Sequence, residues 1–221
     1  MTGICGLVGR ETDDLESKAK TILSLMEDRG LKSRTFVQSL PDREKIAIGI
    51  CDSSDAQSFS NSAIPLALDG VFFGDDQGHG NPAPAGPSRL IQTTGAFAFL
   101  TSLQDHLIAG RDIVGQKPLY YGKAEDGIVA FASLKSPLIS IGIHEPSPVS
   151  PGKVIRASVR GHETVHDYSL KQPKEEPIGE LDATHALDDL FREAVRRAVP
   201  RHSGIAFWGI GQRTSRQGGE D

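Results

Sequence analysis

Two side chains near the start of the chain are suited to act as nucleophiles. The sequence opens Met-Thr-Gly-Ile-Cys-Gly-Leu-Val-Gly, which places a hydroxyl at Thr2 and a thiol at Cys5. An α-amine has a pKa of about 8 and can serve as the base for a nucleophile on the same residue. Either residue, once it stood at the start of the mature chain, would be a candidate catalytic nucleophile.

A buried strand is the element that must hold these side chains. Ile4, Leu7 and Val8 are apolar, the residues between them are mostly small, and no charge precedes Arg10. Small residues let a backbone pass close to its neighbours, so this pattern predicts a buried first strand. A strand that begins at the chain start would hold the terminal amine inside the fold.

Composition argues against several classes of function. The chain has 221 residues, a net charge of −5 and no block rich in lysine and arginine, so nucleic-acid binding is not expected. No apolar run approaches the roughly 18 residues of a membrane span, and the N-terminus does not have the pattern of a signal peptide. The two cysteines, Cys5 and Cys51, do not make a disulfide framework, which favours a reduced, cytoplasmic setting. A buried, unreactive thiol is the alternative to a catalytic role for each of them.

Periodicity predicts an α+β fold. Apolar residues at three- and four-residue steps indicate a helix over 15–26, capped by Asp13 or Asp14 and followed by Gly30. A second, short helix is expected over 134–141. Strands are predicted over 35–37, 45–50, 64–73 (with a turn at Asp69-Gly70), 96–101, 106–110, 119–122 and 128–132, and in a hairpin over 154–159 and 163–168. Together these elements predict two layers of antiparallel strands with a helix or two.

The C-terminal part has a different organisation. Residues 171–180 are predicted to form a linker, and Leu187, Leu190 and Phe191 belong to a helical stripe that follows it. Residues 203–211 begin as a buried strand and are followed by a polar tail. One helix and one strand cannot bury their own apolar faces, so residues 181–221 are interpreted as the truncated start of a second domain.

Two other segments contain motifs that we interpret as structural. Residues 74–88 are rich in glycine and proline but lack the strand-to-helix context of a phosphate cradle, so they are predicted to be a flexible loop. His162-Glu163-Thr164-Val165-His166 spells the zinc-protease motif H-E-x-x-H, which requires both histidines on one helix face. The surrounding residues favour a strand, on which residues four apart are separated by roughly 13 Å. No metal site is therefore expected.

Several motifs, taken in order, resemble the class II glutamine amidotransferases, specifically the glutaminase domain of asparagine synthetases. The start of the chain is similar to Met-Cys-Gly-Ile-x-Gly, and residues 110–121 are similar to Gly-Arg-Asp-x-x-Gly-x-x-Pro-Leu-Tyr-Tyr, the most specific motif present. Further similarities lie at 25–30, 67–71, 95–99, 132–135 and 151–152. The resemblance covers roughly residues 1–170. It implies an Ntn-hydrolase αββα sandwich of two mainly antiparallel sheets with flanking helices.

The resemblance also implies a reaction. In that family the initiator Met is removed, and the exposed Cys attacks the γ-amide of glutamine while an Asn side chain and a Gly N–H hold the oxyanion. By position, Thr2 takes the place of the nucleophile, and Asp69 and Gly70 take the oxyanion-hole positions. Cys5 is an alternative nucleophile if four residues are removed. The implied partners are glutamine and a synthetase domain or a homodimer partner; ATP and Mg²⁺ would belong to the synthetase domain, and no cofactor is expected in this chain.

Departures from the family pattern are concentrated in the chemistry. Ala47 falls near the position of the Arg that grips the glutamine carboxylate, Asp69 replaces the Asn, and Val71 replaces a Glu. A carboxylate would repel a developing oxyanion, and loss of one donor costs about 10²–10³ in rate. The main hypothesis is therefore a degenerate domain that does not hydrolyse glutamine. The alternatives are an active hydrolase that uses Thr2, or Cys5 after processing, and an unrelated α+β interaction module, against which the 110–121 motif argues.

Overall fold

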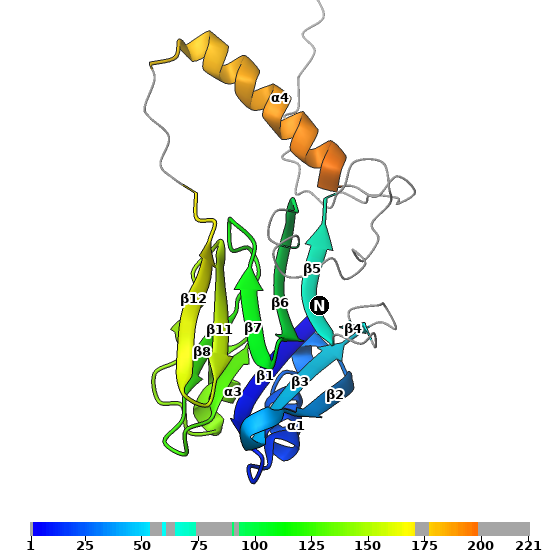
Figure 1. Cartoon of the computed structure of the whole chain (residues 1–221). Helices are drawn as coiled ribbons and strands as arrows, with labels where there is room; N and C mark the ends of the chain where they lie inside the picture. The colour runs from blue at the N-terminus through cyan, green and yellow to red at the C-terminus, as the bar shows by residue number, and fades with distance from the viewer. Residues whose placement is uncertain are drawn as a thin grey trace, which may run out of the picture.

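The structure is a computed structural model that describes residues 2–53, 59–60, 65–73, 90, 93–170 and 177–198. Within these residues it contains two six-stranded antiparallel sheets (Figure 1). Sheet 1 consists, in spatial order, of β10 (Ser147–Pro148), β8 (Tyr120–Lys123), β9 (Val129–Ala132), β1 (Thr2–Arg10), β3 (Glu44–Asp52) and β2 (Lys32–Ser39). Sheet 2 consists of β12 (Gly161–Asp167), β11 (Lys153–Ser158), β7 (His106–Arg111), β6 (Gly95–Leu103), β5 (Leu66–Phe72) and β4 (Phe59–Ser60).

Alternating side chains build the core between the two sheets. Ile4 and Val8 of β1 pack there with Ala67 of β5 and Leu100 of β6. Successive side chains of a strand point to opposite faces, so the residues between them in β1 face the other way. The predicted buried first strand is thus confirmed, and it contributes to both faces of sheet 1.

Helices cover the outer face of sheet 1. The predicted first helix is confirmed as α1 (Leu15–Ser24), and Asp14 caps it by accepting a hydrogen bond from the Ser17 N–H at 3.1 Å. The predicted second helix is α3 (Lys135–Ser140), which packs on β9. The predicted α+β sandwich of mainly antiparallel sheets with flanking helices is therefore confirmed.

A short 3₁₀ turn, η1 (Glu27–Arg29), follows α1 and brings Arg29 to the start of β1. A Cβ atom on Gly30 would lie 2.1–2.5 Å from backbone atoms of Asp52 in β3, a distance that only glycine permits. This close approach places η1, and with it Arg29, against β3.

The turn predicted at Asp69-Gly70 is wrong. Strand β5 runs without interruption through both residues and pairs with β6 along its whole length. Gly70 has φ +152°, and a Cβ atom there would lie 2.1 Å from the carbonyl oxygen of Ala96. The glycine therefore allows two strands to approach closely, and tertiary pairing overrides the local preference of Asp-Gly for turns.

Some of the remaining predictions are confirmed, and others concern segments outside the described residues. His162 and His166 lie on strand β12, as predicted. The C-terminal helix is confirmed as α4 (Glu180–Ala198), which starts within the predicted linker. The 74–88 loop, most of the linker (171–176) and the 203–211 segment lie outside the described residues. None of the helices that the structure describes is long and apolar enough to cross a membrane.

Candidate active site

Thr2 and Asp69 lie in opposite sheets and face the same space. Thr2 is on the same face of β1 as Ile4, and Asp69 is on the same face of β5 as Ala67, and both of these apolar residues belong to the core between the sheets. Thr2 is partly exposed at the start of β1, whereas the Asp69 side chain is only 1% exposed. The fold thus brings two of the predicted site residues to one end of the sandwich.

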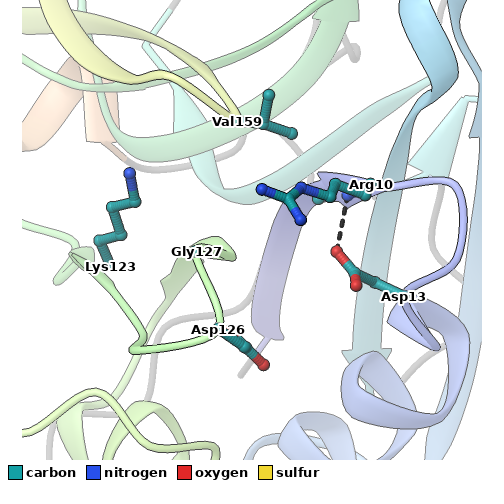
Figure 2. A pocket seen from close by; sticks show the side chains of 7 residues that line it. Arg10, Asp13, Lys123, Asp126, Gly127 and Val159 are labelled. Atoms are coloured by element: carbon teal, nitrogen blue, oxygen red, sulfur yellow. Dashed lines mark hydrogen bonds between the residues drawn. The ribbon is translucent and has the colours of Figure 1, made fainter.

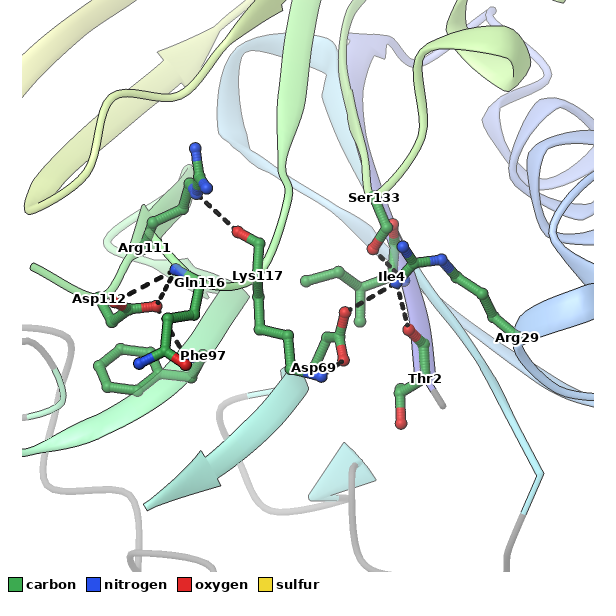
Figure 3. Close-up of polar contacts among 10 residues, drawn as sticks. All are labelled: Thr2, Ile4, Arg29, Asp69, Phe97, Arg111, Asp112, Gln116, Lys117 and Ser133. Carbon is green, nitrogen blue, oxygen red and sulfur yellow. Dashed lines mark hydrogen bonds and ion pairs between the residues drawn. The ribbon is translucent and has the colours of Figure 1, made fainter. Parts of the chain in front are cut away.

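The Asp69 carboxylate is held between two cations (Figure 3). Its Oδ2 atom accepts a hydrogen bond from Nη1 of Arg29 at 3.0 Å, and its Oδ1 atom lies 3.3 Å from Nζ of Lys117. Burial raises the pKa of Asp69 above its ordinary value, and the charges of Lys117 and Arg29 oppose this rise. The residue at the predicted oxyanion position is therefore a buried acid that already has two positively charged partners.

Arg29 connects this acid to Thr2, the predicted nucleophile. The same Nη1 atom that contacts Asp69 donates a hydrogen bond to the Thr2 carbonyl oxygen at 3.1 Å. The chain's α-amine also lowers the pKa of Asp69, although less than burial, Lys117 and Arg29 affect it. The backbone of Thr2, the Arg29 guanidinium and the Asp69 carboxylate thus form one polar network.

Asp112 organises the segment that carries Lys117. Its buried carboxylate accepts hydrogen bonds from the N–H groups of Phe97 (3.0 Å), Val114 (2.9 Å), Gly115 (2.7 Å) and Gln116 (3.1 Å). One side chain therefore satisfies the N–H groups of a tight turn and ties that turn to β6. Hydrogen bonds to a charged acceptor are about twice as strong as neutral ones, which explains why an acid occupies this position.

Arg111 completes the support of the same turn. Its Nε atom donates to the Lys117 carbonyl oxygen at 2.6 Å, Nη1 donates to the Val149 carbonyl oxygen at 2.7 Å, and Nη2 donates to that of Gly115. Burial lowers the pKa of Arg111, and the neighbouring Asp112 charge opposes this effect. The Gly-Arg-Asp motif therefore has a structural role, because Arg111 and Asp112 fix the turn that directs Lys117 toward Asp69.

Ser133 fixes the other side of β1. Its Oγ atom accepts a hydrogen bond from the Ile4 N–H at 3.0 Å, and its own N–H donates to the Ile4 carbonyl oxygen at 3.0 Å. The pair continues the ladder between β1 and β9 by one residue. Two residues from Thr2, the backbone is thus held on both sides of the strand, by β3 and by Ser133.

The structure places Cys5 away from this network. The side chain is fully buried, packs with Ala19 and Leu23 of α1, and has its Sγ atom 3.9 Å from the Ala19 carbonyl oxygen. Burial, and secondarily the Cys51 thiol, raises the pKa of Cys5. Because odd and even positions of β1 face opposite sides of the sheet, Cys5 does not share a face with Thr2 and Asp69.

The other substituted positions differ in their surroundings. Ala47 is buried under α1, whereas Val71 on β5 is 51% exposed. Gly70 lies beside Asp69 in the same strand and pairs with Phe97. Among the described residues, no three His, Cys, Asp or Glu side chains lie close enough together to hold a metal ion.

Sequence reasoning did not assign a role to Arg29 or Lys117. Both lie within motifs of the sequence, 25–30 and 110–121, but neither position is adjacent to Asp69 in the chain. The available signal was chemical: a buried acid requires compensating charge, and cations in motifs are candidates to supply it.

The two sheets and their flanking helices form an α+β sandwich, with Thr2 and Asp69 at one end of it. A family profile described as the glutamine amidotransferase domain matches residues 83–148. The fold is similar to that of the glutamine phosphoribosylpyrophosphate amidotransferase of B. subtilis, with a TM-score of 0.61 and 16% identity over 76% of this chain. It is also similar to a structure described as the allosteric regulatory enzyme of purine biosynthesis, with a TM-score of 0.60 and 18% identity over 76% of this chain.

The chain spans about half the length of these two proteins, 50% and 49% respectively. No curated protein matches the chain in sequence. The chain therefore shares the fold of these two structures, and the profile match covers 66 of its 221 residues.

Proposed function

We propose that this chain is the glutaminase-type domain of an asparagine-synthetase-like protein and that its site no longer hydrolyses glutamine. One observation carries the second part: the buried Asp69 carboxylate stands at the predicted oxyanion position. Its lone pairs accept hydrogen bonds and cannot donate one to a developing oxyanion. Arg29 and Lys117 already bind this carboxylate, so their positive charge is only partly available to stabilise a developing oxyanion.

The asparagine-synthetase assignment rests on the order of the sequence motifs. Helix α4 supports the accompanying two-domain organisation, because Leu187, Leu190 and Phe191 are 66–70% exposed on it. An apolar stripe of this kind requires a partner surface, which we assign to a synthetase domain that follows residues 1–170. ATP and Mg²⁺ would bind that second domain, and glutamine would bind this one only in an active form of the site.

A second candidate function is an active hydrolase in which Thr2 attacks glutamine or another amide. The observation that favours it is the network around Thr2: Arg29 holds the Thr2 carbonyl oxygen, and the α-amine acts electrostatically on Asp69. After removal of Met1, Arg29 would link the new N-terminal residue, Thr2, to this acid. In this mechanism Asp69 positions Thr2 through Arg29, and Gly70 is the remaining candidate oxyanion donor.

Two measurements distinguish these functions. Mass spectrometry of the purified chain first establishes whether Met1, or the segment through Ile4, is removed. Ammonia release from glutamine is then measured for the wild type, Thr2→Ala and Cys5→Ala, with Thr35→Ala on β2 as the matched control. We expect no release above background from any of these proteins. Turnover that Thr2→Ala or Cys5→Ala abolishes, and that Thr35→Ala retains, would refute the degenerate site.

A further inference from the structure

A pocket lined by charged side chains lies at the opposite end of β1 from Thr2 (Figure 2). Its volume is about 110 Å³, and side chains from both sheets line it. The residues come from the end of β1 and the turn after it, from the end of β8 and the β8–β9 turn, and from the β11–β12 turn: Gly9, Arg10, Asp13, Lys123, Asp126, Gly127 and Val159. The pocket is therefore formed where three chain reversals meet.

The two cations of this pocket are not paired with an acid. Within the part of the chain that the structure describes, neither the Arg10 guanidinium nor the Lys123 ammonium has an ion-pair or hydrogen-bond partner. Figure 2 shows the guanidinium extending into the space between β1 and the β8–β9 turn, with Lys123 on the other side of that space. Arg10 and Lys123 are both exposed, so water screens their mutual repulsion, and an anion bound between them would reduce it further.

The two acids of the pocket, in contrast, have their own partners. Asp13 accepts a hydrogen bond from the Arg10 backbone N–H at 2.6 Å, which closes the turn after β1. Asp126 accepts one from the Ile128 N–H at 3.1 Å and lies 3.0 Å from Nζ of Lys18. Partial burial acts to raise the pKa of Asp126, but these contacts with Ile128 and Lys18 outweigh it and hold the pKa below its usual value.

The charges of the pocket therefore favour an anion. Lys18 forms an ion pair with Asp126, and the Asp13 carboxylate accepts a hydrogen bond from the Arg10 backbone N–H. The positive charges of Arg10 and Lys123 are therefore only partly compensated. A guanidinium presents a planar fork that matches two oxygens of a phosphate or carboxylate, and an ammonium adds a point charge. The volume corresponds to a few water molecules at roughly 30 Å³ each, which is enough for a tetrahedral oxyanion.

We propose that this pocket binds a small oxyanion of the phosphate class, with Arg10 and Lys123 as its ligands and Gly127 allowing a close approach. Gly127 has φ +91°, and a Cβ atom there would meet nothing within 4 Å, so its side faces open space. The anion is either free inorganic phosphate or the phosphate of a small organic molecule. The site is separate from the Thr2–Asp69 network, so it does not depend on the function proposed above.

The test is a titration of the full chain, followed by two-dimensional ¹H–¹⁵N NMR. Inorganic phosphate and glycerol 3-phosphate are added in separate experiments at constant ionic strength with chloride as the counter-ion. We expect saturable shifts of the Gly9 and Gly127 amides. We also expect affinity to fall about tenfold in Arg10→Gln and in Lys123→Gln, because each removes one charge-assisted contact with the anion. Tighter binding of glycerol 3-phosphate than of phosphate would identify an organic phosphate as the ligand, and equal affinities would identify the free ion.

Two controls keep the result interpretable. Arg10→Lys retains the charge and should retain saturable binding, and Lys20→Gln removes a cation that pairs with Glu16 on the exposed side of α1 and should leave binding unchanged. Unaltered spectra away from the pocket would show that each variant folds. Shifts that rise without saturation, or that are the same in Arg10→Gln, Lys123→Gln and the wild type, would overturn the proposal.

Discussion

The ammonium of Lys117 lies 3.3 Å from the Asp69 carboxylate, and hydrogen bonds within the motif that carries Lys117 hold it at this position. Arg111 and Asp112 hold the backbone on either side of the turn, and neither contacts Thr2 in the described structure. The Gly-Arg-Asp motif thus supports the turn, while the charge network that it completes contacts the backbone of Thr2 through Arg29.

Arg29 and Lys117, the two cations bound to Asp69, should contribute unequally to stability. Arg29→Met should lower the free energy of unfolding by about 3 kcal/mol, because it leaves a buried carboxylate with one partner and the Thr2 carbonyl without its donor. Lys117→Met should cost less, about 1 kcal/mol, since Lys117 is 31% exposed and water partly screens its charge. Urea denaturation measures both, with Lys20→Met as a surface control that should change little. A larger loss for Lys117→Met than for Arg29→Met would contradict this ranking.

Asp69 should make stability depend on pH. Because its pKa is raised in the folded state, the folded chain binds more protons than the unfolded chain above the ordinary value of 3.8. The stabilisation from the protonated form is complete below this value and is lost as pH rises through the folded pKa. Relative to Asp69→Asn, the wild type should therefore lose unfolding free energy as pH increases from 3.5 toward 7. Urea denaturation at several pH values checks this sign, and a relative gain would show that Arg29 and Lys117 outweigh burial.

Asp112→Asn should loosen the turn that carries Lys117. An amide has one oxygen in place of two and adds an NH₂ group beside four N–H donors, so we expect a loss of about 2–4 kcal/mol. Hydrogen exchange at the Val114 and Gly115 amides should accelerate more than exchange in β3. Equal acceleration throughout the chain would indicate a global effect and not a local role for Asp112.

Both thiols should be unreactive in the folded protein. Burial raises the pKa of Cys5 and that of Cys51, and the thiolate is the form that reacts. Ellman's reagent at pH 8 should modify neither thiol over the time in which it modifies both in urea. Rapid modification of Cys5 in the native chain would show that this side chain can leave the core under α1.

The sequence predicts the scaffold well because its signals are local. Alternating small and apolar residues identify β1, and the three- and four-residue steps from Leu15 identify α1. The prediction of a turn at Asp69-Gly70 is wrong because the same dipeptide that favours a turn also permits close strand pairing with β6. Arg29 and Asp69 are 40 residues apart, so only the packing of two sheets reveals their pairing.

We propose that Thr2 stands at the predicted nucleophile position and does not act as a nucleophile on glutamine. Trapping with a diazoketone analogue of glutamine tests this most directly, because a covalent adduct reports on the residue itself and not on a contaminating glutaminase. The processed chain and Thr2→Ala are incubated with the analogue and digested, and the N-terminal peptide is examined by mass spectrometry. We expect an unmodified N-terminal peptide in both proteins. An adduct on Thr2 that is absent from Thr2→Ala and that free glutamine suppresses would contradict it.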